Sequence, residues 1–165
     1  MDILPAFSDA WASRLDPKAK WSERRDAMAA LADAASAPRL ATGDYGGVAR
    51  EVRRVMQRDS NVLCVTEALR AVAALARSLR RGLGPHARAL AAESLSKARD
   101  KKAAVVEAAG EALRELGRHC LSVAEVAEEV AAVGGDKNPG VRRAALEWAA
   151  HVVAMVRRSV DAVYM

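Results

Sequence analysis

The stretch that decides the fold is Lys18-Ala19-Lys20-Trp21-Ser22-Glu23-Arg24-Arg25, which places two lysines and a tryptophan in one tight turn. Pro17 opens the turn, and Ala27, Met28 and Leu31 follow at the spacing of an apolar helix stripe. A tryptophan at such a polar corner either fills a local gap in the fold or anchors a partner. Similar polar turns recur about every 40 residues, which favours the partner-facing interpretation.

Helix-period stripes and their breakers divide the chain into pairs of helices. No stretch alternates with the period of two that a half-buried strand needs. The second helix of each pair begins near Trp21, Asn61, Ala103 and Pro139, and this repeat of two helices is typical of HEAT solenoids. We therefore expect an all-α, paddle-like HEAT-repeat α-solenoid of about four helical pairs. A helical bundle with short loops is the alternative.

The pairs are expected at 6–36, 44–82, 86–118 and 122–163 within a single domain spanning 1–165.

Individual helices are predicted from their stripes and end signals. Gly82 and Gly84-Pro85 are expected to end the fourth helix, and Ser122 with Glu125 forms a capping-box pattern before the seventh. The stripe of the sixth helix is expected to contain Val106, and that of the last helix to reach Val156 and Val163. The predicted helices are 6–15, 21–36, 44–58, 61–81, 86–98, 103–118, 122–133 and 139 to the end of the chain.

Composition limits the class of protein and of partner. The 165 residues carry a formal net charge of +5, which indicates an acidic partner but leaves nucleic acid, an anionic membrane and an acidic protein all open. Cys64 and Cys120 each lie among apolar neighbours, as small buried side chains do in a reducing compartment. The N-terminus lacks the pattern of a signal peptide, and the apolar run Trp148–Val156 is too short to span a bilayer. We expect a soluble, cytosolic chain.

The lysines of the chain concentrate in the predicted turns within pairs. In stacked helical hairpins, these turns fall on one edge and the connectors between pairs on the other. Arginines such as Arg39, Arg80, Arg81 and Arg118 lie on the connector edge, so net charge does not separate the two edges. The placement of the lysines together with Trp21 distinguishes the two edges. It predicts a positive ridge on the within-pair edge, with an aromatic residue at one end. The six lysines are Lys18, Lys20, Lys97, Lys101, Lys102 and Lys137.

An ordered set of turn sequences resembles the TOG domains of the Dis/TOG family of microtubule polymerases, the second TOG domain of such arrays most of all. The set covers nearly the whole chain. It consists of Lys20-Trp21-Ser22-Glu23-Arg24-Arg25, Gly43-Asp44-Tyr45, Asp59-Ser60-Asn61-Val62, Lys101-Lys102 and Asp136-Lys137-Asn138-Pro139.

The resemblance implies a flat HEAT paddle whose within-pair edge binds the curved αβ-tubulin heterodimer, in a cytoplasmic protein of microtubules, the spindle or the centrosome. Trp21 matches the aromatic residue that contacts β-tubulin, and the other turns supply further contacts. The tubulin-binding residues implied are Lys20, Trp21, Asn61, Val62, Lys101, Lys102, Lys137 and Asn138.

One feature departs from the family pattern. TOG domains have about six HEAT repeats, whereas this sequence shows four pairs and ends inside a predicted helix at Ala162-Val163-Tyr164-Met165. We therefore expect a fragment or a shortened domain, weaker contact with α-tubulin, and self-association through an uncapped last helix.

Other chemistry finds little support in the sequence. His86, His119 and His151 lie on different pairs, so no metal is expected. The glycine-rich turn 134–140 follows a helix and has no Ser or Thr after Lys137, unlike a phosphate loop. No cofactor is predicted and nothing indicates an enzyme. Trp11 and Trp148 are expected in the core, and the sequence leaves open whether Arg24 and Arg25 pair internally or reach the partner.

The alternatives are a HEAT adaptor for another acidic protein or a basic helical protein that binds nucleic acid.

Overall fold

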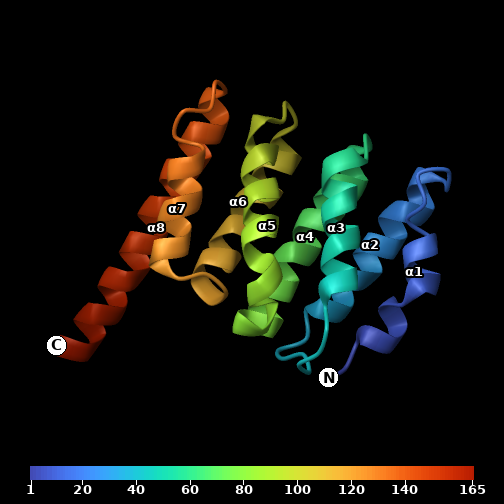
Figure 1. Ribbon diagram of the computed structural model, residues 1–165, viewed down its shortest axis with the longest axis horizontal. Coiled ribbons are helices and arrows are strands. Elements are labelled where there is room, and N and C mark those ends of the chain that lie inside the picture. Colours follow the sequence, from blue (N-terminus) through green and yellow to red (C-terminus); the bar gives the residue numbers. More distant parts are fainter.

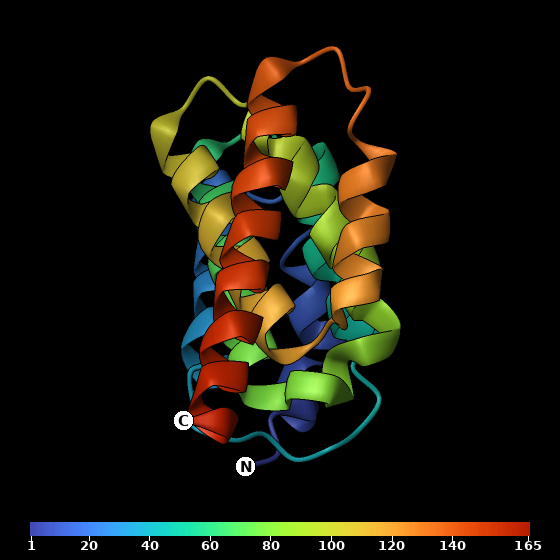
Figure 2. The same ribbon diagram turned by 90° about the vertical axis from the view of Figure 1, so that its left-hand side faces the viewer.

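The chain folds into two layers of antiparallel helices. The computed structural model describes all 165 residues. Figures 1 and 2 show α1, α3, α5 and α7 in one layer, and α2, α4, α6 and α8 in the other. The bounds are α1 Asp9–Ser13, α2 Trp21–Ala35, α3 Gly46–Arg58, α4 Val62–Leu79, α5 Gly84–Ser96, α6 Ala103–His119, α7 Val123–Ala132 and α8 Pro139–Tyr164, with short 3₁₀ helices η1 Leu4–Phe7, η2 Arg80–Leu83 and η3 Lys97–Arg99.

The stacking confirms the predicted α-solenoid and excludes the closed bundle. Each second helix contacts the next one along the chain, from α2 to α4, α6 and α8, and α3, α5 and α7 contact one another in the same order. The first and last helices lie at opposite ends of the molecule (Figure 1). Each pair therefore packs only against its neighbours, as in repeat proteins.

Small side chains allow the second helices to approach closely. The centre of α4 runs through Ala71, Val72, Ala73, Ala74 and Leu75, all at most 1% exposed, so this helix is buried on every side. Close packing of such short side chains gives the layer its continuous core.

Two of the three tryptophans lie in this core, as the sequence predicts. Trp11 is 5% and Trp148 2% exposed, and the indole N–H of Trp11 donates to the carbonyl of Ala27 at 2.9 Å. Both rings therefore serve packing. Trp11 fastens the first pair together.

The first pair begins differently from the prediction. The single helix expected at 6–15 is divided into η1 and α1 at Ser8, whose backbone is extended. The third helix begins at Gly46 and not at Asp44, because the Asp44 side chain accepts a hydrogen bond from the Gly46 N–H at 2.8 Å and so holds the chain in a turn before the helix.

The junction between α4 and α5 also differs from the prediction. We expected the fourth helix to reach Arg81 and Gly84-Pro85 to end it, but α4 ends at Leu79 and Gly84 and Pro85 form the first turn of α5. Proline suits that position because the first N–H groups of a helix have no partner within it. Arg80 has a φ of 53°, which breaks the helix before the glycines do.

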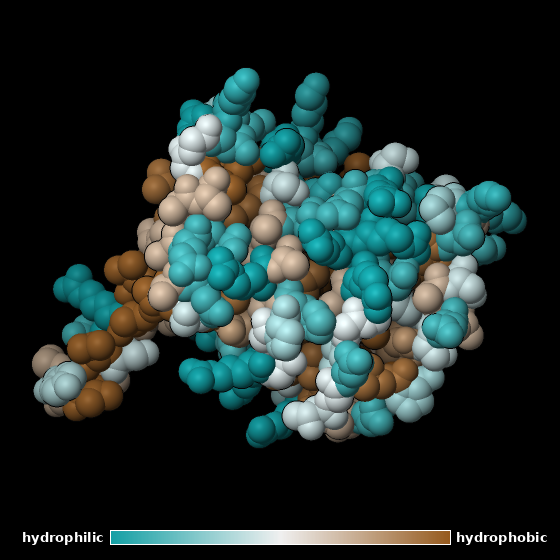
Figure 3. Space-filling view, in the orientation of Figure 1, coloured by the Kyte–Doolittle hydropathy of each residue, from teal (hydrophilic) through white to brown (hydrophobic).

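Two predicted stripes are only partly correct. In α6 the buried valine is Val105 at 1% exposure, while Val106 is 36% exposed. In α8 the buried side chains end at Val152, and Val156 and Val163 are exposed because the second half of this helix projects past α7 (Figures 1 and 3). Self-association through this apolar helix stays a prediction. None of the helices combines the length and the hydrophobicity needed to cross a bilayer.

Candidate functional site

The four turns within pairs lie along one edge of the solenoid. Residues 14–20, 59–61, 97–102 and 133–138 form these turns, and they follow one another along the upper edge in Figure 1. We call this the turn edge. The connectors between pairs form the opposite edge. The arrangement is the one that the sequence predicts, and it brings all eight predicted site residues to the turn edge or to the first residues of the helices beside it.

A single local hydrogen bond repeats in all four turns. In each, an aspartate Oδ1 accepts from the backbone N–H two residues later: Asp16 from Lys18 at 2.7 Å, Asp59 from Asn61 at 2.9 Å, and Asp100 from Lys102 and Asp136 from Asn138 at 2.8 Å. This Asx turn directs the carboxylate towards the backbone. One oxygen of each of these four carboxylates is therefore occupied within its own turn.

The lysines of the same turns have no such partner. Lys18, Lys20, Lys101, Lys102 and Lys137 are all exposed, and every ion pair of the chain is made by an arginine or a histidine. Lys97 is half-buried in η3. Figure 3 shows hydrophilic side chains projecting from this edge. The turn edge thus presents positive charge that is available to an acidic surface.

Trp21 is exposed but held in place. Its side chain is 46% exposed at the first residue of α2, and the guanidinium of Arg25 lies 5.2 Å from the centre of its ring. Its backbone carbonyl accepts a hydrogen bond from the Cys64 thiol at 3.3 Å, which joins the start of α2 to α4. An aromatic ring on a fixed backbone loses little freedom when a partner covers it.

Arg24 and Asp59 connect the first turn to the second. Arg24 Nε lies 2.7 Å from Asp59 Oδ2 and Nη2 lies 3.2 Å from Oδ1, while Nη1 donates to the carbonyls of Pro17 and Ala19. The hydrogen bond that Arg24 donates to Asp59 raises the pKa of Arg24. Burial raises the pKa of Asp59, but the hydrogen bonds from Arg24 and from the Asn61 N–H outweigh it and bring this pKa below its ordinary value. Arg24 is thus a structural residue, which the sequence alone left open.

Arg25, the second arginine left open by the sequence, pairs with its neighbour Asp26 at 2.6 Å on an exposed surface. Its guanidinium remains close to Trp21 and to the turn edge. Arg25 therefore orients the indole and adds positive charge beside it.

The third and fourth turns are also connected. Arg99 of η3 lies 3.5 Å from Asp136, and Arg142 donates to the Asp136 carbonyl. The Gly140 backbone packs so closely that a Cβ there would lie 2.8 Å from the Ala98 carbonyl oxygen. This contact requires glycine near the start of α8, and it fixes Lys137 and Asn138 relative to Lys101 and Lys102.

Asn61 and Asn138 serve first as helix caps. The Asn61 oxygen accepts from the N–H groups of Leu63 and Cys64, and the Asn138 oxygen accepts from that of Gly140. Their amide NH₂ groups make no bond within the chain and remain able to donate. Leu63 was not predicted as a site residue, although it is an apolar side chain 48% exposed at the turn edge, beside the half-buried Val62. Its position off the stripe of Val65 and Leu69 was the available signal.

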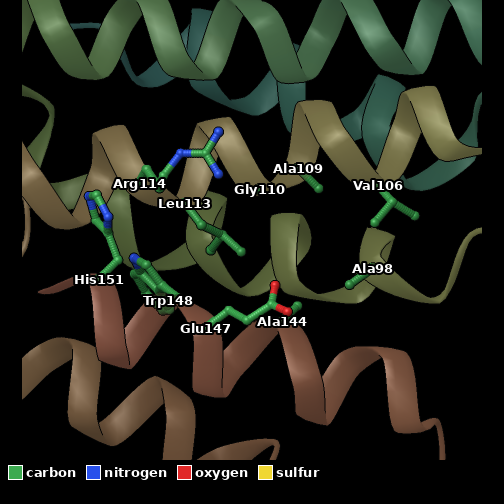
Figure 4. A pocket seen from close by; sticks show the side chains of 10 residues that line it. All are labelled: Ala98, Val106, Ala109, Gly110, Leu113, Arg114, Ala144, Glu147, Trp148 and His151. Atoms are coloured by element: carbon green, nitrogen blue, oxygen red, sulfur yellow. The ribbon is translucent and has the colours of Figure 1, made fainter.

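A separate cavity of about 220 Å³ lies between α6 and α8, below the third turn (Figure 4). It exists because Gly110, Ala109 and Ala144 fill little space there, and Trp148 lines one end. The Trp148 indole N–H has no hydrogen-bond partner. The cavity belongs to the face of the second helices and adds nothing to the turn edge. No group of His, Cys, Asp and Glu side chains is arranged to hold a metal ion.

Comparison with known proteins supports the family that the turns suggest. No protein-family model matches the sequence. The chain is 33% identical over 135 residues to Protein MOR1 of Oryza sativa subsp. japonica, and 26% identical over 142 residues to the spindle pole body component alp14 of Schizosaccharomyces pombe. These alignments cover 81% and 86% of the chain, but only 7% and 17% of the two relatives.

Solved structures agree with the architecture. One chain, from work on microtubule plus-end tracking by XMAP215, CLIP-170 and EB1, superposes with a TM-score of 0.85 at 28% identity, over 92% of this chain and 63% of that one. Another, from work on tubulin recruitment by microtubule polymerases with TOG domain arrays, gives 0.79 at 27% identity, over 90% of this chain and 31% of that one. The chain is therefore a TOG domain and belongs to the Dis/TOG family. Its likeness to the second TOG domain of an array stays a prediction.

Proposed function

We propose that the chain binds αβ-tubulin through its turn edge, as a domain of a microtubule-associated protein that regulates microtubule polymerisation. The observation that carries the proposal is the exposed indole of Trp21 on a fixed backbone, at one end of a row of unpaired lysines. The proposed contacts are Lys20, Trp21, Asn61, Val62, Lys101, Lys102, Lys137 and Asn138.

The physical roles of these residues differ. Covering a half-exposed tryptophan with a partner surface typically gives a hot spot, worth about 2 kcal/mol or more on truncation. Exposed lysines act mainly on the rate of encounter and on its salt dependence. The capping asparagines offer their free NH₂ groups from positions fixed by the helix ends. Tubulin suits this edge because the related structures come from work on microtubule plus ends and tubulin recruitment.

The test is binding of the intact chain to purified αβ-tubulin, by size-exclusion co-elution and by titration at moderate salt. Trp21→Ala should weaken binding about thirtyfold or more. The matched control is Val153→Ala, which truncates a side chain of 63% exposure on α8, away from the turn edge. The control should bind like the unaltered chain.

Either of two results would contradict the proposal. Failure of the folded, unaltered chain to bind tubulin would remove tubulin as the partner and leave another acidic protein. Tubulin binding that survives Trp21→Ala unchanged would move the interface away from the turn edge.

The wider role follows from the same proposal. We infer a binding module without catalysis of its own, located in the cytoplasm on microtubules and at the spindle, in line with the spindle pole body relative. A single domain that holds one tubulin dimer would recruit subunits, and growth of a polymer would need several such domains in one assembly.

A further inference from the structure

The edge opposite the tubulin-facing turns carries a second concentration of positive charge. A shallow depression of about 500 Å³ lies where the connectors and the ends of α4 and α6 meet. Its lining contains Arg39, Arg80, Arg81 and Arg118 together with His119, and no aspartate or glutamate. All four arginines are exposed and none forms an ion pair. We call these four residues the connector-edge arginines.

Tertiary contacts bring these segments together from two connectors and the end of α6. The Leu40 N–H donates to the Ser78 carbonyl at 3.4 Å, which places Arg39 beside the end of α4. The Cys120 thiol donates to the Ala76 carbonyl at 3.6 Å, which holds the end of α6 against the same helix. The cluster therefore depends on the stacking of the repeats.

His119 reports the positive field within the depression. Burial lowers the pKa of His119, Glu115 at 3.2 Å opposes this effect, and the charges of Arg80 and Arg118 lower the pKa further. Glu115 is the only acidic group among these influences, and its carboxylate also lies 3.9 Å from Arg77 Nε. No acidic side chain forms an ion pair with the four arginines, so their positive charge is not compensated.

Arg80 adds an independent observation. Its φ of 53° and ψ of −125° match the first central position of a type II′ turn, where glycine is strongly preferred because a Cβ is strained there. A long charged side chain at such a position costs stability, and strained residues of this kind gather at binding sites. Basic residues at the C-terminal ends of α4 and α6 would also compensate the partial negative charge of the helix dipoles. That role requires neither the strained backbone of Arg80 nor the presence of Arg39.

We propose that the connector-edge arginines bind an acidic, carboxylate-rich peptide segment of a partner protein. Guanidinium groups pair with carboxylates in a bidentate manner. The arginines come from a connector and from the ends of α4 and α6, and stacked helices lie about 8–10 Å apart. An extended chain of the polyproline II type presents every third side chain on one face at intervals of about 9 Å, so acidic side chains at every third position suit this spacing. No aromatic ring lines the depression, so it lacks a stacking platform for nucleic acid bases.

The test uses the intact chain and a fluorescein-labelled peptide of Glu-Gly-Gly repeats, followed by fluorescence anisotropy at low and at physiological salt. Arg81→Gln/Arg118→Gln should weaken binding about tenfold. Arg80→Gly should weaken it about threefold, and yet leave the midpoint of thermal unfolding unchanged or raised, because glycine relieves the backbone. Arg157→Gln/Arg158→Gln on α8 removes the same charge elsewhere and should change nothing.

Three outcomes would overturn the proposal. The first is that the peptide does not bind even at low salt. The second is that binding is lost with Lys101→Gln/Lys102→Gln and kept with the connector-edge variants, which would place the peptide on the turn edge. The third is that a short single-stranded oligonucleotide binds more tightly and displaces the peptide, which would assign the cluster to nucleic acid. The experiment contains no tubulin, so its result is independent of the function proposed above.

Discussion

Arg24 and Asp59 form a bidentate ion pair between the first two turns, although 35 residues separate them in sequence. The side chains are only 12% and 6% exposed. Because Arg24 also donates to two carbonyls of the first turn, this one pair fixes the place of Trp21 relative to Asn61. The turn edge is therefore held as a rigid row before any partner binds.

Replacing Asp59 with asparagine should lower the free energy of unfolding by about 1–3 kcal/mol, since it leaves a buried guanidinium without its counter-charge. Urea denaturation measures the change. Asp26→Asn is the control, because the Arg25–Asp26 pair is exposed at 35% and 55% and should cost at most about 0.5 kcal/mol. Equal effects of the two variants would show that the Arg24–Asp59 pair does not stabilise the edge.

Acid should remove the same stabilisation. The pKa of Asp59 is lower in the folded state than in the unfolded chain. The contribution of its ionised form to the free energy of unfolding is therefore complete above about pH 4, and it is lost as the pH falls through the pKa of the folded state. The difference in the free energy of unfolding between the unaltered chain and Asp59→Asn should therefore be constant from neutral pH to about pH 5 and shrink below about pH 4. A difference that grows towards low pH would contradict this assignment.

Gly117→Ala should destabilise the contact between α6 and α8 by about 1–3 kcal/mol. A Cβ at this position would lie 2.7 Å from Trp148 Nε1 and 2.9 Å from Val152 Cγ2, both in the packed core. Gly47→Ala is the matched control within α3, where an added Cβ meets nothing within 4 Å, and it should stabilise by about 0.5–1 kcal/mol. Thermal unfolding of both variants provides the comparison, and a neutral Gly117→Ala would show that the tryptophan can shift without cost.

Both cysteines should resist thiol reagents in the folded chain. Burial raises the pKa of Cys64 to about 11, with the charge of Asp59 adding to the effect, and burial raises that of Cys120 to about 12. At pH 8 we expect labelling by Ellman's reagent at least about a hundredfold slower than in denaturant, because the thiolate is the reacting form. Rapid labelling of native protein would mean that the start of α4 or the end of α6 opens readily.

Lys101→Gln/Lys102→Gln should slow association with tubulin about two- to fivefold at low salt and leave the dissociation rate nearly unchanged. The effect should fade as salt is raised, since both lysines are exposed. Stopped-flow kinetics separates the two rates, with Arg157→Gln/Arg158→Gln as the control of equal charge. A faster dissociation with normal association would instead indicate direct, desolvated contacts.

The sequence by itself determined the helices, their pairing and the polar turns, because these follow from interactions within a few residues. The stripe of α4, the capping box of Ser122 and Glu125, and the aspartates of the four turns are local in this sense. The ordered turn motifs also carried the resemblance to TOG domains, which the comparisons confirm.

Only the tertiary structure decided which side chains meet across repeats. The partner of Arg24 and the gathering of Arg39, Arg80 and Arg118 both depend on how neighbouring pairs stack. Residues 35 or more positions apart come together there, and a helix period fixes which face a residue occupies but not its register against the next helix. The positive φ of Arg80 could not be predicted from the sequence either, because this backbone conformation strongly favours glycine.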